Sequence, residues 1–306
     1  MAVITFLSTH GQIVMAACLL YGLLALASLG VTVGTRARPG SRLRLQVNAW
    51  WLIFPVVSLS LMFYPAGPAL LVLGIGVQAA RELAPHAAHP RLMLAAFIAL
   101  LAALAALAWL WPSLAVALAA MAGAMAIAWY SLAGTRSGLL LAAFAVTMGG
   151  LAFVVALTDL PLAPHILLAW LFYLFVLTAL NDIGQFVIGT LFGKQKIAPG
   201  ISPNKTWQGL GGGLLVSVLV SLILGDYLRL AASQRWLVSV GLMLSVGGFG
   251  GDLAYSALKR RLGIKDFSQL IPGHGGILDR ADSLVLTAPL LYCALRYTIN
   301  QEMGYL

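Results

Sequence analysis

Residues 92–111 read LMLAAFIALLAALAALAWLW, a stretch without a single charged side chain. A helix needs roughly 20 consecutive apolar residues to cross the hydrocarbon core of a bilayer, and this stretch has that length. Because it is apolar on every side, without the alternation of polar and apolar residues that a barrel strand requires, it predicts an α-helix surrounded by lipid or protein. Similar runs recur along most of the chain.

The composition of the chain is typical of an integral membrane protein. Its 306 residues are 61% hydrophobic and 9% charged, with a mean hydropathy of +0.96. So few charges cannot cover a water-soluble surface, which excludes a large soluble domain. We therefore expect an all-α, polytopic integral membrane protein with about ten transmembrane helices and short loops. The spans are expected at 12–33, 48–64, 68–84, 91–111, 113–133, 138–158, 166–191, 208–225, 235–256 and 283–299.

The basic residues predict an orientation in the membrane. Fifteen of the 18 lysines and arginines fall in loops that follow odd-numbered spans, whereas the loops after even-numbered spans carry only Arg229 and Arg235. By the positive-inside rule the basic loops face the cytoplasm and both termini lie outside. The net charge of +9 then reflects topology and attraction to anionic membrane lipids, and no nucleic-acid partner is expected. We expect the inner membrane of a bacterium.

Polar residues are concentrated in the second half of the chain, where most of the nine acidic residues lie. Charged groups are costly near a bilayer and usually have a function there. We therefore predict N-terminal scaffold helices over residues 1–165 and a catalytic region over 166–306. Its active site is expected at the cytoplasmic ends of the C-terminal helices, in polar loops at 193–207 and 259–282.

The first polar segment, 179–213, contains Asp182 within a predicted span. An ionised carboxylate there is costly unless it meets a cation, a metal or water, and a hydrogen bond between helices is the alternative. Further along, Ser202, Lys205 and Thr206 come directly before an apolar run. Hydroxyl groups, backbone amides and a lysine at a helix start form a site for an anion such as phosphate, although a capped helix after any polar loop would look similar.

The second polar segment begins on the ninth predicted span. If that helix continues through Lys259, then Asp252, Ser256 and either Lys259 or Arg260 share one face. The alternative is a basic helix end whose side chains reach toward the membrane surface.

Residues 271–283, IPGHGGILDRADS, follow in the same segment. Asp279 and Asp282 are three residues apart, and carboxylates are the ligands that Mg²⁺ prefers, so together with Asp252 they could hold divalent cations. Gly275 and Gly276, with Gly273, would let the backbone approach a ligand closely. His274 between them suits either a phosphate contact or a structural role. Carboxylates, basic residues and a glycine-rich turn together indicate phosphoryl or nucleotidyl transfer.

Residues 256–282, SALKRRLGIKDFSQLIPGHGGILDRAD, resemble the signature of the phosphatidate cytidylyltransferases, also called CDP-diacylglycerol synthases. The positions that match are Ser256, Lys259, Arg260, Lys265, Asp266, Ser268, Pro272, His274, Gly275, Gly276, Asp279, Arg280 and Asp282. Residues 182–209 also resemble the upstream nucleotide region of that family. There the matching positions are Asp182, Gly184, Gly189, Phe192, Gly193, Lys194, Ser202, Pro203, Lys205, Thr206, Trp207 and Gly209.

The resemblance implies that CTP and phosphatidic acid are condensed to CDP-diacylglycerol and pyrophosphate. It implies Mg²⁺, held by Asp252, Asp279 and Asp282, and a second ion that could be monovalent, such as K⁺. Ser256, Lys259, Arg260, Asp279 and Asp282 would be catalytic, and a homodimer is one option for the assembly. The substrate- or nucleotide-binding residues would be Asp182, Ser202, Lys205, Thr206, Lys265, Asp266, His274, Gly275, Gly276 and Arg280.

This chemistry needs no general base. A lipid phosphate monoester has a second pKa of about 6 and is largely dianionic at pH 7. The difficulty is repulsion between two polyanions, which metal ions and basic side chains reduce. Two alternatives stay open: a CTP-dependent transferase with a different lipid phosphate as acceptor, and a transporter that uses Asp182 as an ion site.

A smaller polar group lies at 81–89. Glu82, His86 and His89 have a spacing that could suggest a metal site, but Pro85 would disturb the helix that this spacing requires. With Arg81, these residues are better explained as lining an entrance for a lipid headgroup.

Overall fold

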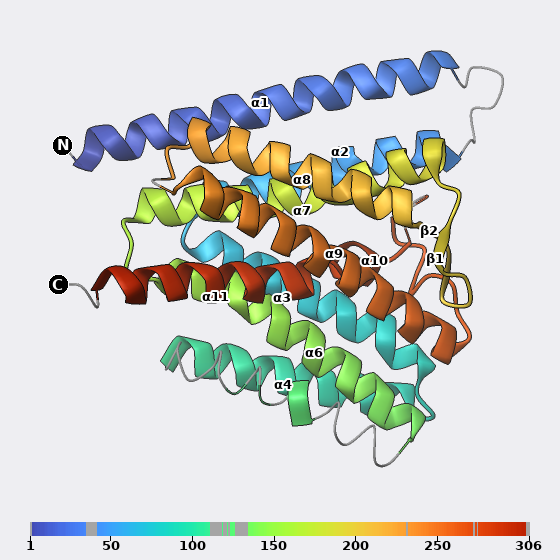
Figure 1. The fold of residues 1–306 in the computed structure, drawn as a ribbon. Helices are drawn as coiled ribbons and strands as arrows, with labels where there is room; N and C mark the ends of the chain where they lie inside the picture. Colours follow the sequence, from blue (N-terminus) through green and yellow to red (C-terminus); the bar gives the residue numbers. More distant parts are fainter. Residues whose placement is uncertain are drawn as a thin grey trace.

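The computed structural model describes residues 2–34, 42–110, 118, 121, 123–125, 134–230, 232–271, 273 and 275–303. Long α-helices lie side by side in one bundle (Figure 1). Seven helices of the described part are long and apolar enough to cross a membrane, which confirms an all-α, polytopic membrane protein. The long helices are α1 (Ala2–Gly34), α2 (Arg42–Met62), α3 (Ala66–Leu83), α4 (Pro90–Leu110), α6 (Arg136–Ala156), α7 (Pro164–Phe192), α8 (Trp207–Tyr227), α9 (Gln234–Leu262) and α11 (Leu284–Met303).

These helices coincide with nine of the predicted spans, and the fifth span, 113–133, lies outside the described residues except for 118, 121 and 123–125. The total of ten spans therefore stays a prediction. Two of the nine helices, α3 and α11, are not among the seven that qualify as membrane spans. Both carry polar side chains, since α3 ends in Arg81 and Glu82 and α11 includes Arg296.

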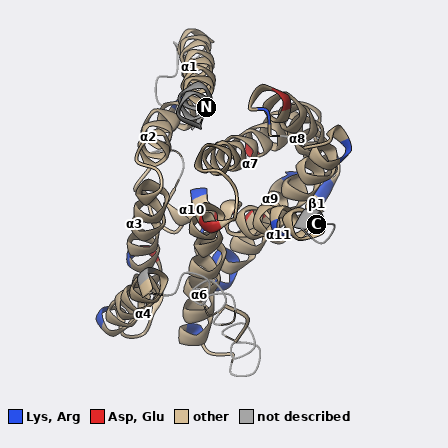
Figure 2. Ribbon diagram, turned by 90° about the vertical axis from the view of Figure 1, so that its left-hand side faces the viewer, with Lys and Arg blue, Asp and Glu red and all other residues tan. Residues whose placement is uncertain are grey.

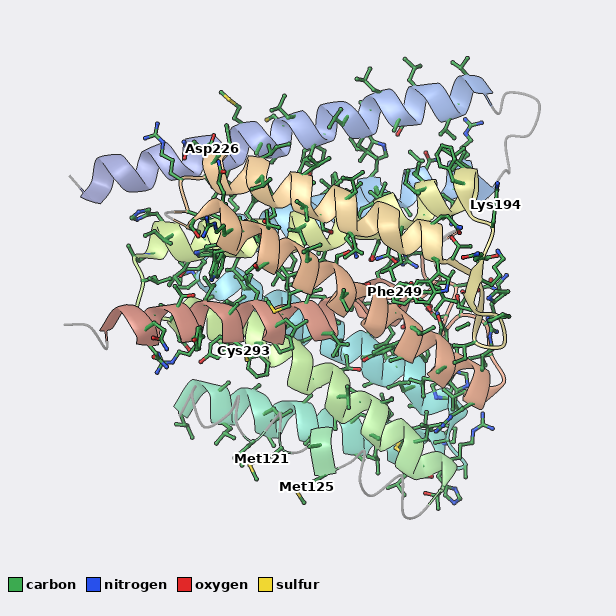
Figure 3. The ribbon with its side chains drawn as sticks, in the orientation of Figure 1. Met121, Met125, Lys194, Asp226, Phe249 and Cys293 are labelled. Carbon is green, nitrogen blue, oxygen red and sulfur yellow. The ribbon has the colours of Figure 1, made fainter. Side chains whose placement is uncertain are left out.

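The described residues of the predicted basic loops lie at one end of the bundle (Figure 1), which we call the polar end. Arg136 at the start of α6 donates to the carbonyl oxygen of His86 at 2.7 Å, and to that of Leu262 at 3.4 Å. The end of α9 and the segment after α3 therefore meet there. Lys194 lies at this end and Asp226 lies at the opposite one (Figure 3). Seen along the bundle, charged residues occupy few positions on the helices (Figure 2).

The predicted polar loop 193–207 contains a small hairpin that the sequence did not suggest. Strands β1 (Lys196–Ala198) and β2 (Ser202–Thr206) pair antiparallel, with Lys196 opposite Thr206 and Ala198 opposite Ser202. The strands are short, mostly polar and interrupted by Pro203, so they lack the alternating pattern by which strands are recognised. Local hydrogen bonds support the hairpin, since Gln208 accepts from the backbone amides of Lys194 and Gln195.

The C-terminal half packs tightly around α7, whose side chains from Leu167 to Leu174 are buried. Glycines allow α8 to approach α7 closely, because a Cβ atom at residue 212 would overlap the side chain of Ile188. In contrast, α1 exposes large apolar side chains, such as Leu26 at 67%. Exposed apolar surface of this kind is suited to lipid.

Candidate active site

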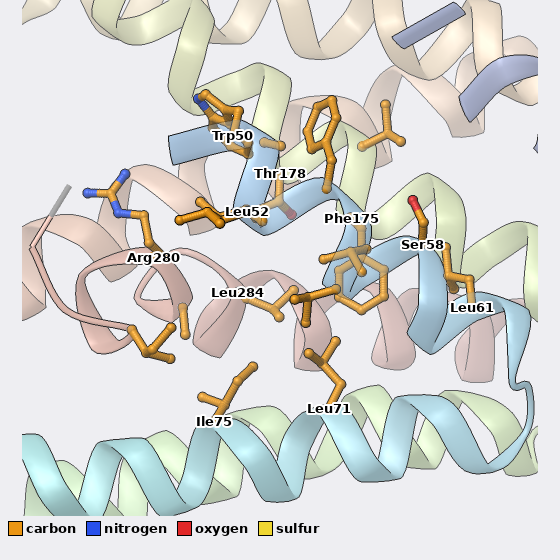
Figure 4. A pocket seen from close by; sticks show the side chains of 18 of the residues that line it. Trp50, Leu52, Ser58, Leu61, Leu71, Ile75, Phe175, Thr178, Arg280 and Leu284 are labelled. Atoms are coloured by element: carbon orange, nitrogen blue, oxygen red, sulfur yellow. The ribbon is translucent and has the colours of Figure 1, made fainter. Parts of the chain in front are cut away.

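An apolar cavity of 590 Å³ opens between α2, α3, α7 and the segment from Leu270 to Leu284 (Figure 4). Its wall is formed by aliphatic and aromatic side chains from both halves of the chain, among them Leu71, Ile75 and Phe175. Asp182 and Arg280 are its charged lining residues. Arg280 belongs to the short helix α10 (Leu278–Ala281), and its side chain is exposed.

A second, polar pocket of 170 Å³ lies beside the hairpin. It brings together predicted site residues from three segments: Asp182 from α7, Asp252 from α9, and Ser202, Lys205 and Thr206 from β2. Asp182 lines both this pocket and the apolar cavity. The two spaces therefore adjoin at one carboxylate.

Lys205 and Asp252 form an ion pair in the polar pocket, with 2.8 Å between Nζ and Oδ2. Nζ of Lys205 also donates to the backbone carbonyl oxygen of Phe249 at 3.2 Å. The same nitrogen lies 4.3 Å from the centroid of the Phe249 aromatic ring. On α9, Ser256 donates to Oδ1 of Asp252 at 3.3 Å. The helix does continue past Lys259, so the predicted placement of Asp252 and Ser256 on one face is confirmed.

Lys259 and Asp279 form a second ion pair, with 2.5 Å between Nζ and Oδ1. The Asp279 side chain is only 2% exposed. Its other oxygen, Oδ2, accepts from the backbone amides of Phe267 at 3.0 Å and Gly276 at 2.8 Å. Asp279 therefore closes the loop 263–277 onto the end of α9. At Gly275, whose φ is +81°, a Cβ atom would lie 2.6 Å from Oδ2 of Asp279, so this close approach requires glycine.

Two further carboxylates lie where α7 meets the start of α11. Asp182 accepts from the hydroxyl of Ser283, at 3.2 Å to Oδ1 and 3.0 Å to Oδ2. This is the hydrogen bond between helical segments that the sequence left as an alternative. Asp282 is buried between α10 and α11 and accepts from the backbone amide of Ser283 at 2.8 Å. Burial, followed by the negative charge of Asp252, raises the pKa of Asp282.

The remaining predicted site residues that the structure describes lie on the hairpin, at the end of α9 and on the loop after it. Arg260 donates to the carbonyl oxygens of Ile201 at 3.1 Å and Ile264 at 3.2 Å, so it links the hairpin to the loop after α9. Thr206 caps α8 by accepting from the backbone amide of Gly209 at 3.0 Å. Lys265 and Asp266 are exposed on the loop. His274 lies outside the described residues.

Glu82 is a polar residue of this region whose position the sequence did not predict. It does not line an entrance for a headgroup, because its side chain is buried beneath the loop that carries the signature residues. Its carboxylate accepts from Ser268 and from the backbone amides of Ile277 and Leu278. The one available signal was the rarity of acidic residues in the first half of the chain.

The donor chemistry of the site fits a hard divalent cation. Asp182 and Asp252 line the polar pocket, whereas both oxygens of Asp279 are occupied by Lys259 and two backbone amides. In the part of the chain that the structure describes, no group of three or more His, Cys, Asp or Glu side chains could hold a metal by itself. Mg²⁺ suits such a site, because proteins usually bind it through one or two carboxylates, with substrate phosphates and water completing the shell.

Comparison with known proteins identifies the family of the chain. The model of the cytidylyltransferase family matches residues 44–298, which is most of the chain and includes every residue that lines the polar pocket. The chain belongs to the cytidylyltransferase family.

Individual relatives match over shorter stretches. A protein of Escherichia coli K12, named uncharacterized protein YnbB, is 44% identical over 125 residues, or 41% of this chain and 42% of that protein. The phosphatidate cytidylyltransferase of Staphylococcus epidermidis RP62A is 43% identical over 131 residues, or 43% of this chain and 50% of that protein. The phosphatidate cytidylyltransferase of Bacillus subtilis 168 is 41% identical over 128 residues, or 42% of this chain and 48% of that protein. The chain spans about half the length of the curated relatives that it matches.

Proposed function

We propose that this protein is a CTP:phosphatidate cytidylyltransferase, which condenses CTP with phosphatidic acid to give CDP-diacylglycerol and pyrophosphate. The match to the cytidylyltransferase family supports the transfer of a cytidylyl group. Relatives in Staphylococcus and Bacillus that are named phosphatidate cytidylyltransferases support phosphatidic acid as the acceptor.

The observation that carries the proposal is that the apolar cavity and the polar pocket adjoin at Asp182. A lipid phosphate has acyl chains that need an apolar space and a headgroup that needs positive charge. The cavity offers both, because Arg280 lines an otherwise mostly apolar wall. CTP carries several negative charges, and the adjoining pocket holds Lys205. The two substrates can therefore meet phosphate to phosphate.

The reaction follows from the charges of the substrates. An oxygen of the phosphatidate phosphate attacks the α-phosphorus of CTP, the new P–O bond forms, and the bond from the α-phosphorus to the β-phosphate oxygen breaks. Pyrophosphate leaves with that electron pair. Since the attacking phosphate is largely dianionic at pH 7, no side chain has to remove a proton. Lys205 and Arg280, which line the two pockets, lower the repulsion between the two anions, and the pockets hold the substrates in line.

A divalent cation belongs to this proposal. Asp252 lines the polar pocket and would supply a carboxylate oxygen for Mg²⁺, which neutralises phosphate charge when it is bound. Asp279 and Asp282 as further ligands stay predictions of the family resemblance. The second, monovalent cation implied by the family resemblance stays a prediction. We also propose that the polar end faces the cytoplasm of a bacterial inner membrane, because CTP is a cytosolic nucleotide and the basic loops gather at this end.

Purified protein in detergent, supplied with labelled CTP, phosphatidic acid and Mg²⁺, tests the proposal. We expect labelled CDP-diacylglycerol and an equal amount of pyrophosphate. Asp252→Asn should lower the rate at least about 100-fold, as expected for loss of a charge that acts on the transition state. The matched control is Asp226→Asn, which removes one carboxylate at the opposite end of the bundle and should keep the parent rate. Pyrophosphate release only with another lipid phosphate, or full activity of Asp252→Asn, would contradict the proposal.

A further inference from the structure

Glu82 is a buried carboxylate on α3, outside the two segments that carry the family signature. It accepts hydrogen bonds from the second of these segments, residues 256–282. It is 6% exposed. Oε1 accepts from the Ser268 hydroxyl at 2.8 Å and from the Ile277 amide at 2.8 Å, and Oε2 accepts from the Leu278 amide at 3.0 Å. Two of these donors lie in the segment before α10, and Leu278 is the first residue of that helix.

These hydrogen bonds replace a cap that α10 lacks. Ile277 is the N-cap residue of this helix and has no side-chain oxygen to offer, so the first amides of the helix need another acceptor. Glu82 supplies it from a different helix. The contact is also tight, because a Cβ atom at residue 276 would overlap the Glu82 carboxylate. One glycine of the signature is therefore required by a residue far away in the sequence.

The loop is held between two carboxylates that act on adjacent residues. Asp279 accepts from the amides of Phe267 and Gly276, and Glu82 accepts from the neighbours of these two residues, Ser268 and Ile277. The Asp279 carboxylate moves with the loop, whereas Glu82 stands on α3, whose neighbouring residues Ala79, Ala80 and Leu83 are fully buried. Glu82 thus fixes the loop to α3, as the Lys259–Asp279 ion pair fixes it to α9.

We infer that Glu82 is a positioning residue for the reaction, which acts through α10. The helix carries Asp279 and Arg280, and Asp282 follows directly after it, so the register of this single turn sets where all three side chains point. This inference rests on the proposed function of the site. Glu82 itself need not touch a substrate, since its oxygens are occupied by the loop.

Three variants at one position test the role. Glu82→Gln keeps the size of the side chain, but its NH₂ group opposes one of the backbone amides. We expect kcat about tenfold to hundredfold below the parent, from loss of hydrogen bonds to a charged acceptor, while KM for CTP stays within about threefold. Glu82→Asp keeps two acceptor oxygens on a shorter stem and should recover part of kcat. Glu82→Ala should lower it furthest.

A matched control separates positioning from general stability. Leu83→Ala, at the next residue of α3, removes a fully buried side chain that does not contact the loop through a hydrogen bond. It should lower the melting temperature at least as much as Glu82→Gln does, but keep kcat per folded molecule near that of the parent. A kcat loss in Glu82→Gln that only follows its unfolded fraction would overturn the inference.

Amide hydrogen exchange gives a readout that does not depend on activity. In Glu82→Gln the peptide over residues 275–281 should exchange at least about tenfold faster than in the parent, whereas peptides of α7 and α9 should exchange at parental rates. Equal exchange of residues 275–281 in parent and variant would overturn the role of Glu82. If the parent protein makes no CDP-diacylglycerol, the proposed function fails, while the exchange result still decides whether Glu82 holds the loop.

Discussion

At the scale of single residues, the site depends on a buried ion pair between Lys259 and Asp279. Lys259 lies at the end of α9, and its ammonium group is the cation that faces Asp279. Removing one partner of a buried pair leaves the other charge without compensation, and the cost is much larger than the net value of the intact pair. The pair therefore couples stability to the position of the loop.

This coupling gives a prediction for Lys259→Met, which keeps most of the length of the side chain and removes its charge. We expect a loss of about 3–5 kcal/mol in the free energy of unfolding, because Asp279 stays buried without its cation. Thermal unfolding of the purified protein in detergent measures it. The double variant Lys259→Met, Asp279→Asn removes both charges and keeps an acceptor oxygen for the amides of Phe267 and Gly276, so it should regain part of the stability but no activity. If Lys259→Met alone were as stable and as active as the parent, the ion pair would not support the loop.

At the scale of elements, the close contact of α7 with α8 sets the distance between Asp182 and Lys205. Gly212 faces α7, where a Cβ atom would overlap Ile188, whereas Gly211, the residue before it, meets nothing within 4 Å. The two adjacent glycines have the same helical backbone but opposite surroundings. They form a matched pair for a substitution by alanine.

Gly212→Ala should destabilise the protein by about 1–3 kcal/mol, because the added methyl group forces the helices apart. Cytidylyltransferase activity should fall as well, since β2 and Lys205 are carried on the start of α8. Gly211→Ala should be neutral or raise stability by up to about 1 kcal/mol, since alanine is the better helix former. Melting temperatures and rates of both variants decide the matter. Similar losses in both would show that helix contact is not the cause.

The elements also show what the sequence could and could not predict. Uniformly apolar runs such as 92–111 predict helices well, because length and hydropathy alone determine a membrane span. The spacing of Asp252 and Ser256 on one helix followed from helical periodicity alone. The hairpin β1–β2 and the capping of α10 by Glu82 could not be predicted in this way. Both depend on contacts between segments far apart in the chain, and their residues carry no periodic signal.

At the scale of the whole molecule, the first half of the chain contributes more than a scaffold. Glu82 on α3 holds the loop of the second half, and α2 and α3 form one wall of the apolar cavity, opposite α7. The predicted division into residues 1–165 and 166–306 stays a prediction of the chain's organisation. In space, however, the candidate site is built from both parts.

This arrangement predicts that a substitution in the first half changes the use of the lipid substrate alone. Gly74 on α3 lines the cavity, and a Cβ atom there meets nothing within 4 Å, so Gly74→Leu should fill the cavity without disturbing the backbone. Each buried methylene contributes about 0.8 kcal/mol, so excluding two of them should raise KM for long-chain phosphatidic acid roughly tenfold. KM for CTP should not change, and a short-chain phosphatidic acid should be affected less.

The matched control is Gly22→Leu, which adds the same side chain on α1 at a position that also meets nothing within 4 Å and does not line the cavity. Steady-state rates at varied lipid concentration in mixed micelles measure both variants against the parent. Because Gly22→Leu adds the same apolar surface, a rise in KM common to both variants would reflect the micelle and not the cavity. A rise in Gly74→Leu alone, graded by acyl-chain length, would locate the acyl chains between α3 and α7, whereas an unchanged KM for every chain length would show that they bind elsewhere.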